Sequence, residues 1–259
     1  MTLAWVTWIP IGLFVLIAAT FITSYSIAVG LGHVNAFLPY ISDTGTLPPE
    51  SCIFGQFLNI AGFITCILAY IRYLQIRELN NRFRFTKCVQ KLNRWGIWAG
   101  FLTGLGISMV GNFQETNDIA MHLVGANLAF GVGTIYFCIQ CAISYKTVPI
   151  TCNKLLCHFR LVLSIYCIIG YFGVFTFAYL SFNAKPGSIE DNLKWTSDMP
   201  GFGYHLASTI MEWLLALAFI TYILTVTPEF RYIGIREPQV EVLISDEILA
   251  RITPPNQSK

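Results

Sequence analysis

Residues 8–30 read "WIPIGLFVLIAATFITSYSIAVG" and contain no charged side chain. An α-helix rises about 1.5 Å per residue, so this stretch is long enough to cross a hydrocarbon core of about 30 Å. No basic segment precedes it, and we therefore interpret it as a retained membrane anchor and not as a cleaved signal peptide.

The rest of the chain repeats this pattern. Of its 259 residues 55% are hydrophobic and only 12% are charged, and the mean hydropathy is +0.60. Soluble domains carry about 25% charged residues, so a soluble fold is excluded. Further apolar blocks cover residues 52–74, 95–111, 121–144, 159–182 and 204–226. We predict an all-α membrane protein in which residues 1–226 form one domain of six transmembrane helices.

The positive charges set the expected orientation. The loops after the second and fourth blocks hold most of the Lys and Arg residues, the fifth loop has two lysines, and the first and third loops have none. Positive loops stay in the cytosol, which predicts cytosolic N- and C-termini and a lumenal first loop. The formal net charge of +2 gives no indication of a nucleic-acid partner. We expect the basic loops to contact membrane lipids.

Small residues recur on the third and fourth blocks. Helices in lipid associate through close packing, which small side chains permit. We expect the following residues to lie in the packed middle of the bundle: Gly100, Gly104, Gly106, Gly111, Gly125, Ala129 and Gly133.

Glu212 is the carboxylate that lies within an apolar block. A charge there costs several kcal/mol unless it is neutralised, paired or hydrated, so Glu212 must face inward. Other ionisable residues lie near the same membrane surface. The predicted lumenal polar cluster comprises Asp43, Glu115, Asp118, His122, His205 and Glu212.

Three interpretations of this cluster remain open. It is a hydrogen-bonded structural plug, a pH-responsive switch based on histidine titration, or the site of a metal-dependent lipid hydrolase with His122, His205 and Asp43 as ligands. The sequence contains no HExxH or GxSxG motif, which disfavours the hydrolase. We expect no catalytic residue, metal or cofactor, and we interpret Arg72 as a side chain that extends toward the cytosolic interface.

The expected C-terminal tail, residues 227–259, is polar, contains four prolines, and is predicted to be largely disordered. Its "YIGI", Tyr232 to Ile235, has the spacing of a sorting motif that an adaptor protein binds as an added strand.

Several motifs together indicate a family. They are "HVNAFLPYISDTGTLPPES" at residues 33–51, "GNFQ" at 111–114, "HLVGANLAF" at 122–130 and "EW" at 212–213. In their order and spacing they resemble the DRAM family, the damage-regulated autophagy modulators, within the wider Frag/DRAM/Sfk superfamily. The residues that carry the resemblance are Pro39, Tyr40, Ser42, Asp43, Gly45, Pro49, Asn112, Phe113, Gln114, Glu212 and Trp213.

The resemblance implies a six-span protein of lysosomal and endosomal membranes that promotes autophagy and has no established enzymatic reaction. Two alternatives stay open: a lipid-modifying or lipid-redistributing protein, and an ion-channel subunit of the plasma membrane. The prolines and the Asp43-Thr44-Gly45 turn of the first loop restrict the backbone, so we also expect this loop to be a folded cap over the bundle.

Overall fold

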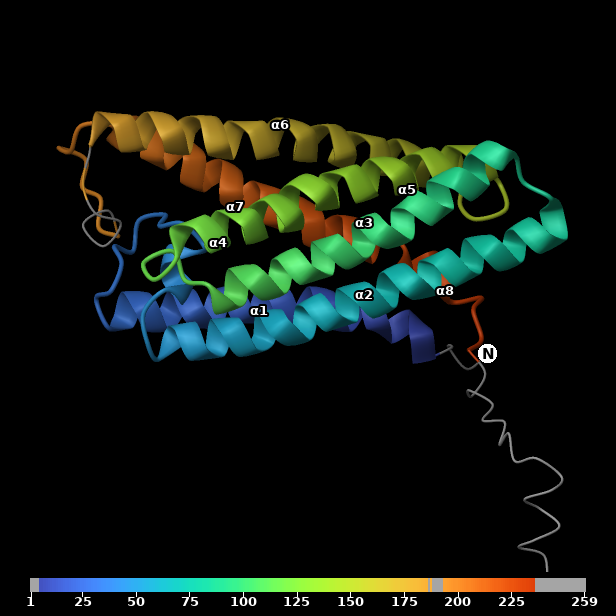
Figure 1. Ribbon diagram of the computed structural model, residues 1–259, viewed down its shortest axis with the longest axis horizontal. Coiled ribbons are helices and arrows are strands. Elements are labelled where there is room, and N and C mark those ends of the chain that lie inside the picture. The colour runs from blue at the N-terminus through green and yellow to red at the C-terminus, as the bar shows by residue number, and fades with distance from the viewer. Residues whose placement is uncertain (1–4, 186, 188–192, 236–259) are drawn as a thin grey trace, which may run out of the picture.

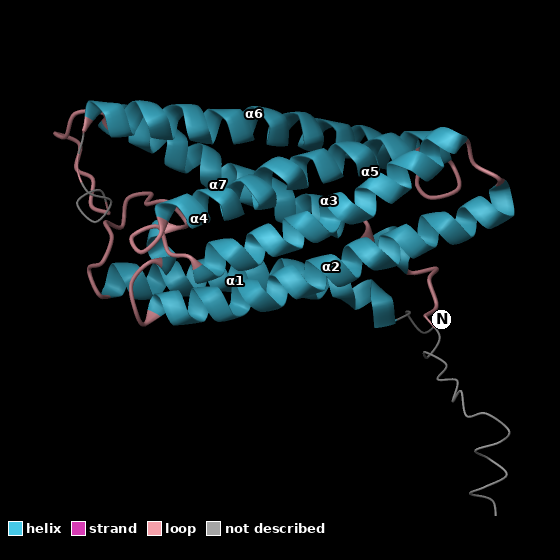
Figure 2. Cartoon of the chain, in the orientation of Figure 1, coloured by secondary structure: helices cyan, strands magenta, loops and turns pink. Residues whose placement is uncertain are grey.

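The computed structural model describes residues 5–185, 187 and 193–235, and every regular element in these ranges is a helix (Figure 2). The prediction of an all-α fold is therefore confirmed. The elements are η1 (Trp5–Thr7), α1 (Trp8–Gly30), η2 (Asp43–Gly45), α2 (Glu50–Phe83), α3 (Lys87–Asn112), α4 (Ile119–Ala126), η3 (Asn127–Val132), α5 (Gly133–Thr147), α6 (Lys154–Ala184), α7 (Phe202–Leu224) and α8 (Thr227–Phe230).

The long helices lie side by side along the longest axis of the molecule (Figure 1). α4, the π-helical segment η3 and α5 follow one another without a break and form one rod. The loop between α1 and α2 and the turn between α3 and α4 lie at the same end of the bundle (Figure 1). We call this the first-loop end.

Five helical stretches among the described residues are long and apolar enough to cross a membrane. They are Trp5–Gly30, Glu50–Phe83, Ile119–Thr147, Lys154–Ala184 and Phe202–Phe230. The expected span at 95–111 lies within α3, which is not one of the five, although α3 packs extensively against α2. The structure thus confirms an all-helical fold with five candidate membrane-spanning helices among the described residues, while the number of six spans stays a prediction.

The contact between α2 and α3 explains the glycines of the third block. A Cβ atom placed on Gly104 would lie 2.6 Å from the carbonyl oxygen of Gly62, and one on Gly62 would lie 2.5 Å from that of Gly104. Both distances are too short for a side chain, so the two backbones approach as closely as glycine allows. Gly106 makes a similar contact with the backbone of Ala129 in η3. The expected packing of small residues is found.

Aromatic and aliphatic side chains fill the space between α1, α2, α5 and α7. Phe137 stacks on Tyr222 with ring centroids 4.0 Å apart, and Leu13, Leu68 and Ile220 are buried in a neighbouring cluster. α6 packs mainly on α7 and leaves a row of large apolar side chains exposed. Such a face suits contact with lipid chains.

The beginning of the expected disordered tail is ordered. α8 follows α7 after two residues and returns to the bundle, where Phe230 is fully buried beside Val6. Residues 236–259, on which the rest of that prediction falls, lie outside the described residues.

Candidate functional site

The first loop is folded and is tied to α1. The Tyr25 hydroxyl donates a hydrogen bond to the Ala36 carbonyl oxygen at 2.6 Å. Ser24 and Thr44 hydroxyls lie 3.1 Å apart, and Thr44 donates to the Ile41 carbonyl oxygen at 2.7 Å. The bonds of Thr44 satisfy polar groups in the buried middle of the loop, residues 43–46, as a folded cap requires.

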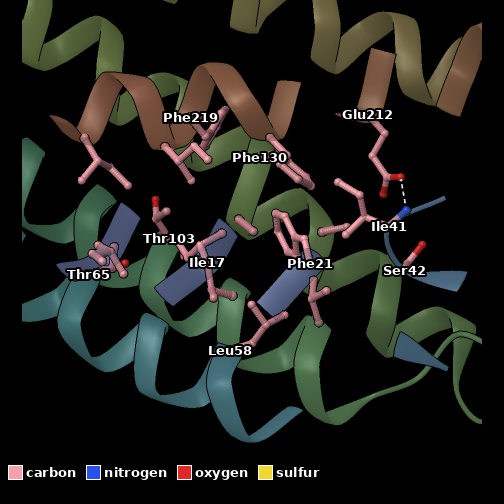
Figure 3. A pocket seen from close by; sticks show the side chains of 18 of the residues that line it. Ile17, Phe21, Ile41, Ser42, Leu58, Thr65, Thr103, Phe130, Glu212 and Phe219 are labelled. Atoms are coloured by element: carbon pink, nitrogen blue, oxygen red, sulfur yellow. Dashed lines mark hydrogen bonds between the residues drawn. The ribbon is translucent and has the colours of Figure 1, made fainter. Parts of the chain in front are cut away.

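The same loop is also tied to α7. The Ile41 amide donates to Oε2 of Glu212 at 2.7 Å, as Figure 3 shows. Trp213 Nε1 donates to the Pro39 carbonyl oxygen at 2.9 Å. Glu212 and Trp213, the "EW" pair of the resemblance, therefore bind the backbone on both sides of Tyr40.

Gly45 allows the first loop to pack closely against α2. A Cβ atom at this position would lie 2.4 Å from the Phe54 ring, so no larger residue fits without displacing that ring. Pro49 directly precedes α2, and Glu50 in its first turn accepts a hydrogen bond from His33. The loop thus contacts α1, α2 and α7.

The "GNFQ" motif shapes the adjacent turn. Asn112 Nδ2 donates to Asn59 Oδ1 at 2.7 Å and so joins α3 to α2. The Phe113 carbonyl oxygen accepts a hydrogen bond from His122 Nδ1 at 2.7 Å. The Gln114 carbonyl oxygen accepts bonds from the amides of Asn117 and Asp118, which closes the turn into α4.

Three of the six predicted cluster residues come together. The carboxyl groups of Asp43, Glu115 and Glu212 interact electrostatically. Asp43 and Glu212 are only 5% and 8% exposed. Oδ2 of Asp43 and Oε1 of Glu115 are buried and accept no hydrogen bond from an N–H or hydroxyl group, but the Asp43 and Glu115 side chains are hydrogen-bonded to each other. No ion pair between described residues involves any of the three.

The environment of Asp43 favours its neutral form. Burial raises the pKa of Asp43 well above its usual range, and the neighbouring carboxyl groups of Glu115 and Glu212 raise it further. Like charges in a desolvated site cannot all ionise at little cost, so the group retains at least one proton where free carboxyls would lose it.

The other three residues have other bonding and packing partners. His205 stacks on Trp195 with centroids 4.5 Å apart and meets the Tyr40 ring edge-on at 5.0 Å, so its surroundings are aromatic. His122 is buried in α4 and bonds back to the Phe113 carbonyl oxygen in the preceding turn. Asp118 is exposed and accepts a hydrogen bond from the Met121 amide at 3.0 Å, so it is the N-cap of α4.

The metal-ligand set considered for a hydrolase is not assembled. Among the described residues no group of three or more His, Cys, Asp or Glu side chains is arranged to hold a metal ion. His122, His205 and Asp43 do not form such a group: His122 bonds the Phe113 carbonyl oxygen and His205 lies among aromatic rings.

An elongated cavity of about 110 Å³ lies beneath the cap, between α1, α2, α3, η3 and α7 (Figure 3). Its polar lining residues at the first-loop end are Ser42, His122 and Glu212. The remaining wall is mostly aliphatic and aromatic.

Residues 5–233 match the Frag1/DRAM/Sfk1/Cwh43P N-terminal domain. The chain belongs to this family. It is 38% identical over 234 residues to the Bos taurus DNA damage-regulated autophagy modulator protein 2, which covers 89% of this chain and 86% of the relative.

Two further relatives extend the family comparison. The Homo sapiens DNA damage-regulated autophagy modulator protein 1 is 37% identical over 219 residues, 85% of this chain and 88% of the relative. The Xenopus laevis modulator of macroautophagy TMEM150B-B is 41% identical over 145 residues, 55% of this chain and 60% of the relative. No solved structure matches.

A second polar cluster of this Frag1/DRAM/Sfk1 family member, at the opposite end of the bundle, was missed by sequence reasoning. Glu229 of α8 forms ion pairs with Arg72 of α2 and with Arg160 of α6; the Arg160 pair measures 2.7 Å. Arg160 also donates to the Thr225 hydroxyl at 2.9 Å, and Arg72 to Gln140 at 3.1 Å.

Both arginines are only 1% exposed, so the prediction that Arg72 reaches the interface was wrong. The carboxylate between the two guanidinium groups offsets the desolvation cost of burying all three charges, and removing any one of them leaves an unpaired buried charge. The sequence did contain a signal: Arg72 and Arg160 lie within the apolar blocks 52–74 and 159–182, where a basic residue needs an acidic partner.

Proposed function

We propose that this protein is a six-span membrane protein of lysosomes and endosomes that promotes autophagy by binding proteins or lipids and not by catalysis. The observation that supports this most is the likeness, over most of the chain, to relatives named autophagy modulators. These relatives are named as modulators and not after a reaction.

The packing of α3 supports six spans with cytosolic termini. α3 has 26 residues, which at about 1.5 Å per residue gives about 39 Å, enough for a crossing. Two of its polar side chains donate hydrogen bonds inside the bundle: Asn93 to the Tyr73 carbonyl oxygen at 3.0 Å, and Ser108 to Asn59. A helix with internally bonded polar groups is tolerated in lipid despite a lower mean hydropathy.

The expected sorting motif is accessible. Tyr232 is 83% exposed and Ile235 is 41% exposed, at the end of the bundle opposite the first loop. If the termini are cytosolic, an adaptor protein reaches this segment directly after α8.

The test combines location, topology and activity. Cells that lack the protein are complemented with the full chain, with Tyr232→Ala, or with Arg231→Ala, which changes an exposed neighbour outside the motif. We expect the wild type and Arg231→Ala to restore autophagic flux from lysosomes, and Tyr232→Ala to shift toward the plasma membrane.

Accessibility of a single cysteine placed at Phe37 or at Lys87 reports the topology. Normal flux without the protein, or cytosolic labelling at Phe37, would contradict the proposal.

A further inference from the structure

Two cysteines meet at the end of the bundle opposite the first loop, where α5 leads into α6 (Figure 1). The Sγ atoms of Cys152 and Cys157 lie 3.2 Å apart, and both thiols are free. The sulfurs of a disulfide are about 2.0 Å apart, so these two need to approach each other by only about 1 Å to form a bond. Among the described residues no other two thiols are hydrogen-bonded to each other.

The turn before α6 holds Cys152 in this place. The hydroxyl oxygens of Thr147 and Thr151 are 2.7 Å apart, and the Thr151 amide donates to the Thr147 carbonyl oxygen at 3.3 Å. On the other side of Cys152, the Asn153 side chain is the N-cap of α6. Because the chain is fixed on both sides of Cys152, its sulfur meets that of Cys157 without further ordering of the backbone.

The two thiols lie beside an excess of positive charge. The ion-pair cluster contains the guanidinium groups of Arg72 and Arg160 and the carboxylate of Glu229, so one of its positive charges has no counter-charge within it. Nη2 of Arg72 is buried without a hydrogen-bond partner. Arg72 interacts electrostatically with Cys152, and Arg160 with Cys157. Neighbouring arginines favour the thiolate, which is the reactive form of cysteine.

The two thiols differ in access to solutes. Cys152 is partly exposed and lines a cavity of about 610 Å³, together with Thr151, Phe159 and Tyr232 among others. Cys157 is fully buried. Because burial disfavours a charged thiolate, Cys152 is the thiol that reacts first with a small solute, and Cys157 is the thiol that reacts second.

We propose that Cys152 and Cys157 form an oxidation site for hydrogen peroxide, which converts the two thiols into an intramolecular disulfide. The Cys152 thiolate attacks one oxygen of the peroxide, the O–O bond breaks, and the leaving hydroxide takes up the proton that the thiol gave up and becomes water. The Cys152 sulfur is then a sulfenic acid.

The second step uses the neighbouring thiol. The Cys157 sulfur attacks the sulfenic sulfur of Cys152, the S–S bond forms and the S–O bond breaks, and the hydroxyl group leaves as water with the Cys157 proton. Two thiols are oxidised to one disulfide while one peroxide is reduced to two water molecules. The peroxide is the only oxidant that the sequence of steps requires.

In the proposed topology this site lies on the cytosolic side of the membrane, where disulfides are transient and redox-sensing. We therefore expect glutathione to reduce the disulfide again by thiol–disulfide exchange. The oxidation itself depends neither on this topology nor on the role in autophagy, so it can be tested separately from both.

The test uses the full-length protein, purified in detergent, reduced, and freed of reductant. It is treated with hydrogen peroxide, blocked with a maleimide during denaturation, and digested with trypsin. Lys154 lies between the two cysteines, so trypsin separates residues 147–154 from residues 155–160 unless a disulfide joins them. We expect the two peptides to be joined after peroxide treatment and to separate with dithiothreitol. Two separate, maleimide-labelled peptides after peroxide treatment would overturn the proposal.

Variants distinguish the two steps. Cys157→Ser removes the second thiol, so the joined peptides should be lost and the sulfenic acid of Cys152 should persist and react with dimedone. Cys152→Ser should lose the joined peptides without dimedone labelling of Cys157, because that thiol is buried. Dimedone labelling of Cys157 in a folded Cys152→Ser protein, or none of Cys152 in a folded Cys157→Ser protein, would overturn the assigned order.

Two further cysteines serve as controls. Cys88 is exposed in the first turn of α3, and Cys88→Ser should leave the yield of joined peptides unchanged. Cys141 is buried and interacts electrostatically with both Cys152 and Cys157, so it is the competing partner. Cys141→Ser should also leave the yield unchanged. Loss of the joined peptides in a folded Cys141→Ser protein, or a disulfide from Cys152 to Cys141 in the wild type, would overturn the proposal.

Discussion

The Ile41 amide and the Glu212 carboxylate are 171 positions apart in the sequence and are joined by a hydrogen bond of 2.7 Å. This bond places the middle of the first loop over the interior of the bundle. It also gives a buried carboxylate a backbone donor, which explains how α7 tolerates Glu212.

Replacing Glu212 should therefore loosen the cap. Glu212→Ala leaves the Ile41 amide buried without an acceptor, which costs about 1–3 kcal/mol. Glu212→Gln keeps an acceptor oxygen and should be closer to the wild type. Thermal unfolding in detergent measures both variants. Equal melting temperatures for Glu212→Ala and the wild type would show that the bond contributes nothing to stability.

The cap should be more stable in acid, because burial and neighbouring carboxyls raise the pKa of Asp43. Above pH 3.8, the ordinary value for an aspartic acid, the folded protein binds more protons than the unfolded chain, so its stability falls as pH rises through the raised pKa. Asp43→Asn should flatten this dependence and raise stability at neutral pH. The measurement is the melting temperature between acidic and neutral pH.

Asp118→Asn is the matched control for Asp43→Asn. Asp118 is exposed and caps α4, and asparagine caps helices as well as aspartate does. This variant should keep the pH dependence of the wild type. A pH profile that is flat already in the wild type would contradict the assignment of Asp43.

A larger loss of stability is expected at the ion-pair cluster of Arg72, Arg160 and Glu229. Glu229→Gln leaves Arg72 and Arg160 buried without a counter-charge and should cost about 3–5 kcal/mol. Glu78→Gln removes the partner of the exposed Arg82 and should change little. The melting temperatures of the two variants in detergent measure the two losses of stability. A similar small loss in both would mean that water reaches the buried arginines.

Trp213 allows the cap to be tested without a charge change. Trp213→Phe keeps an aromatic ring but removes the donor to the Pro39 carbonyl oxygen, a loss of about 0.5–1.5 kcal/mol. Faster proteolysis within the first loop is the expected readout. Trp98→Phe, on an exposed face, should leave the cleavage rate unchanged.

The sequence was sufficient for features that depend on local pattern. Apolar blocks predicted the helices, the glycines predicted the close contact at Gly104, and the unusual position of Glu212 predicted that it faces inward. The proline-rich first loop was expected to be folded, and its bonds to α1 and α7 confirm this.

Contacts between residues that are far apart in the sequence could not be predicted from local pattern. Arg72 was considered alone because its partner Glu229 lies 157 positions later, beyond the expected end of the last span. His205 was grouped with the carboxyls because its stacking partner, Trp195, belongs to a loop without a recognisable pattern. Asp118 had a local signal, since an aspartate directly before an apolar helix is a typical N-cap.

The most direct test of the folded cap is hydrogen exchange at the Ile41 amide in the wild type and in Glu212→Ala. We predict strong protection of this loop amide in the wild type and its loss in the variant, while the amides of α6 exchange alike in both proteins. Exchange of the Ile41 amide at the rate of an exposed loop in the wild type would contradict it.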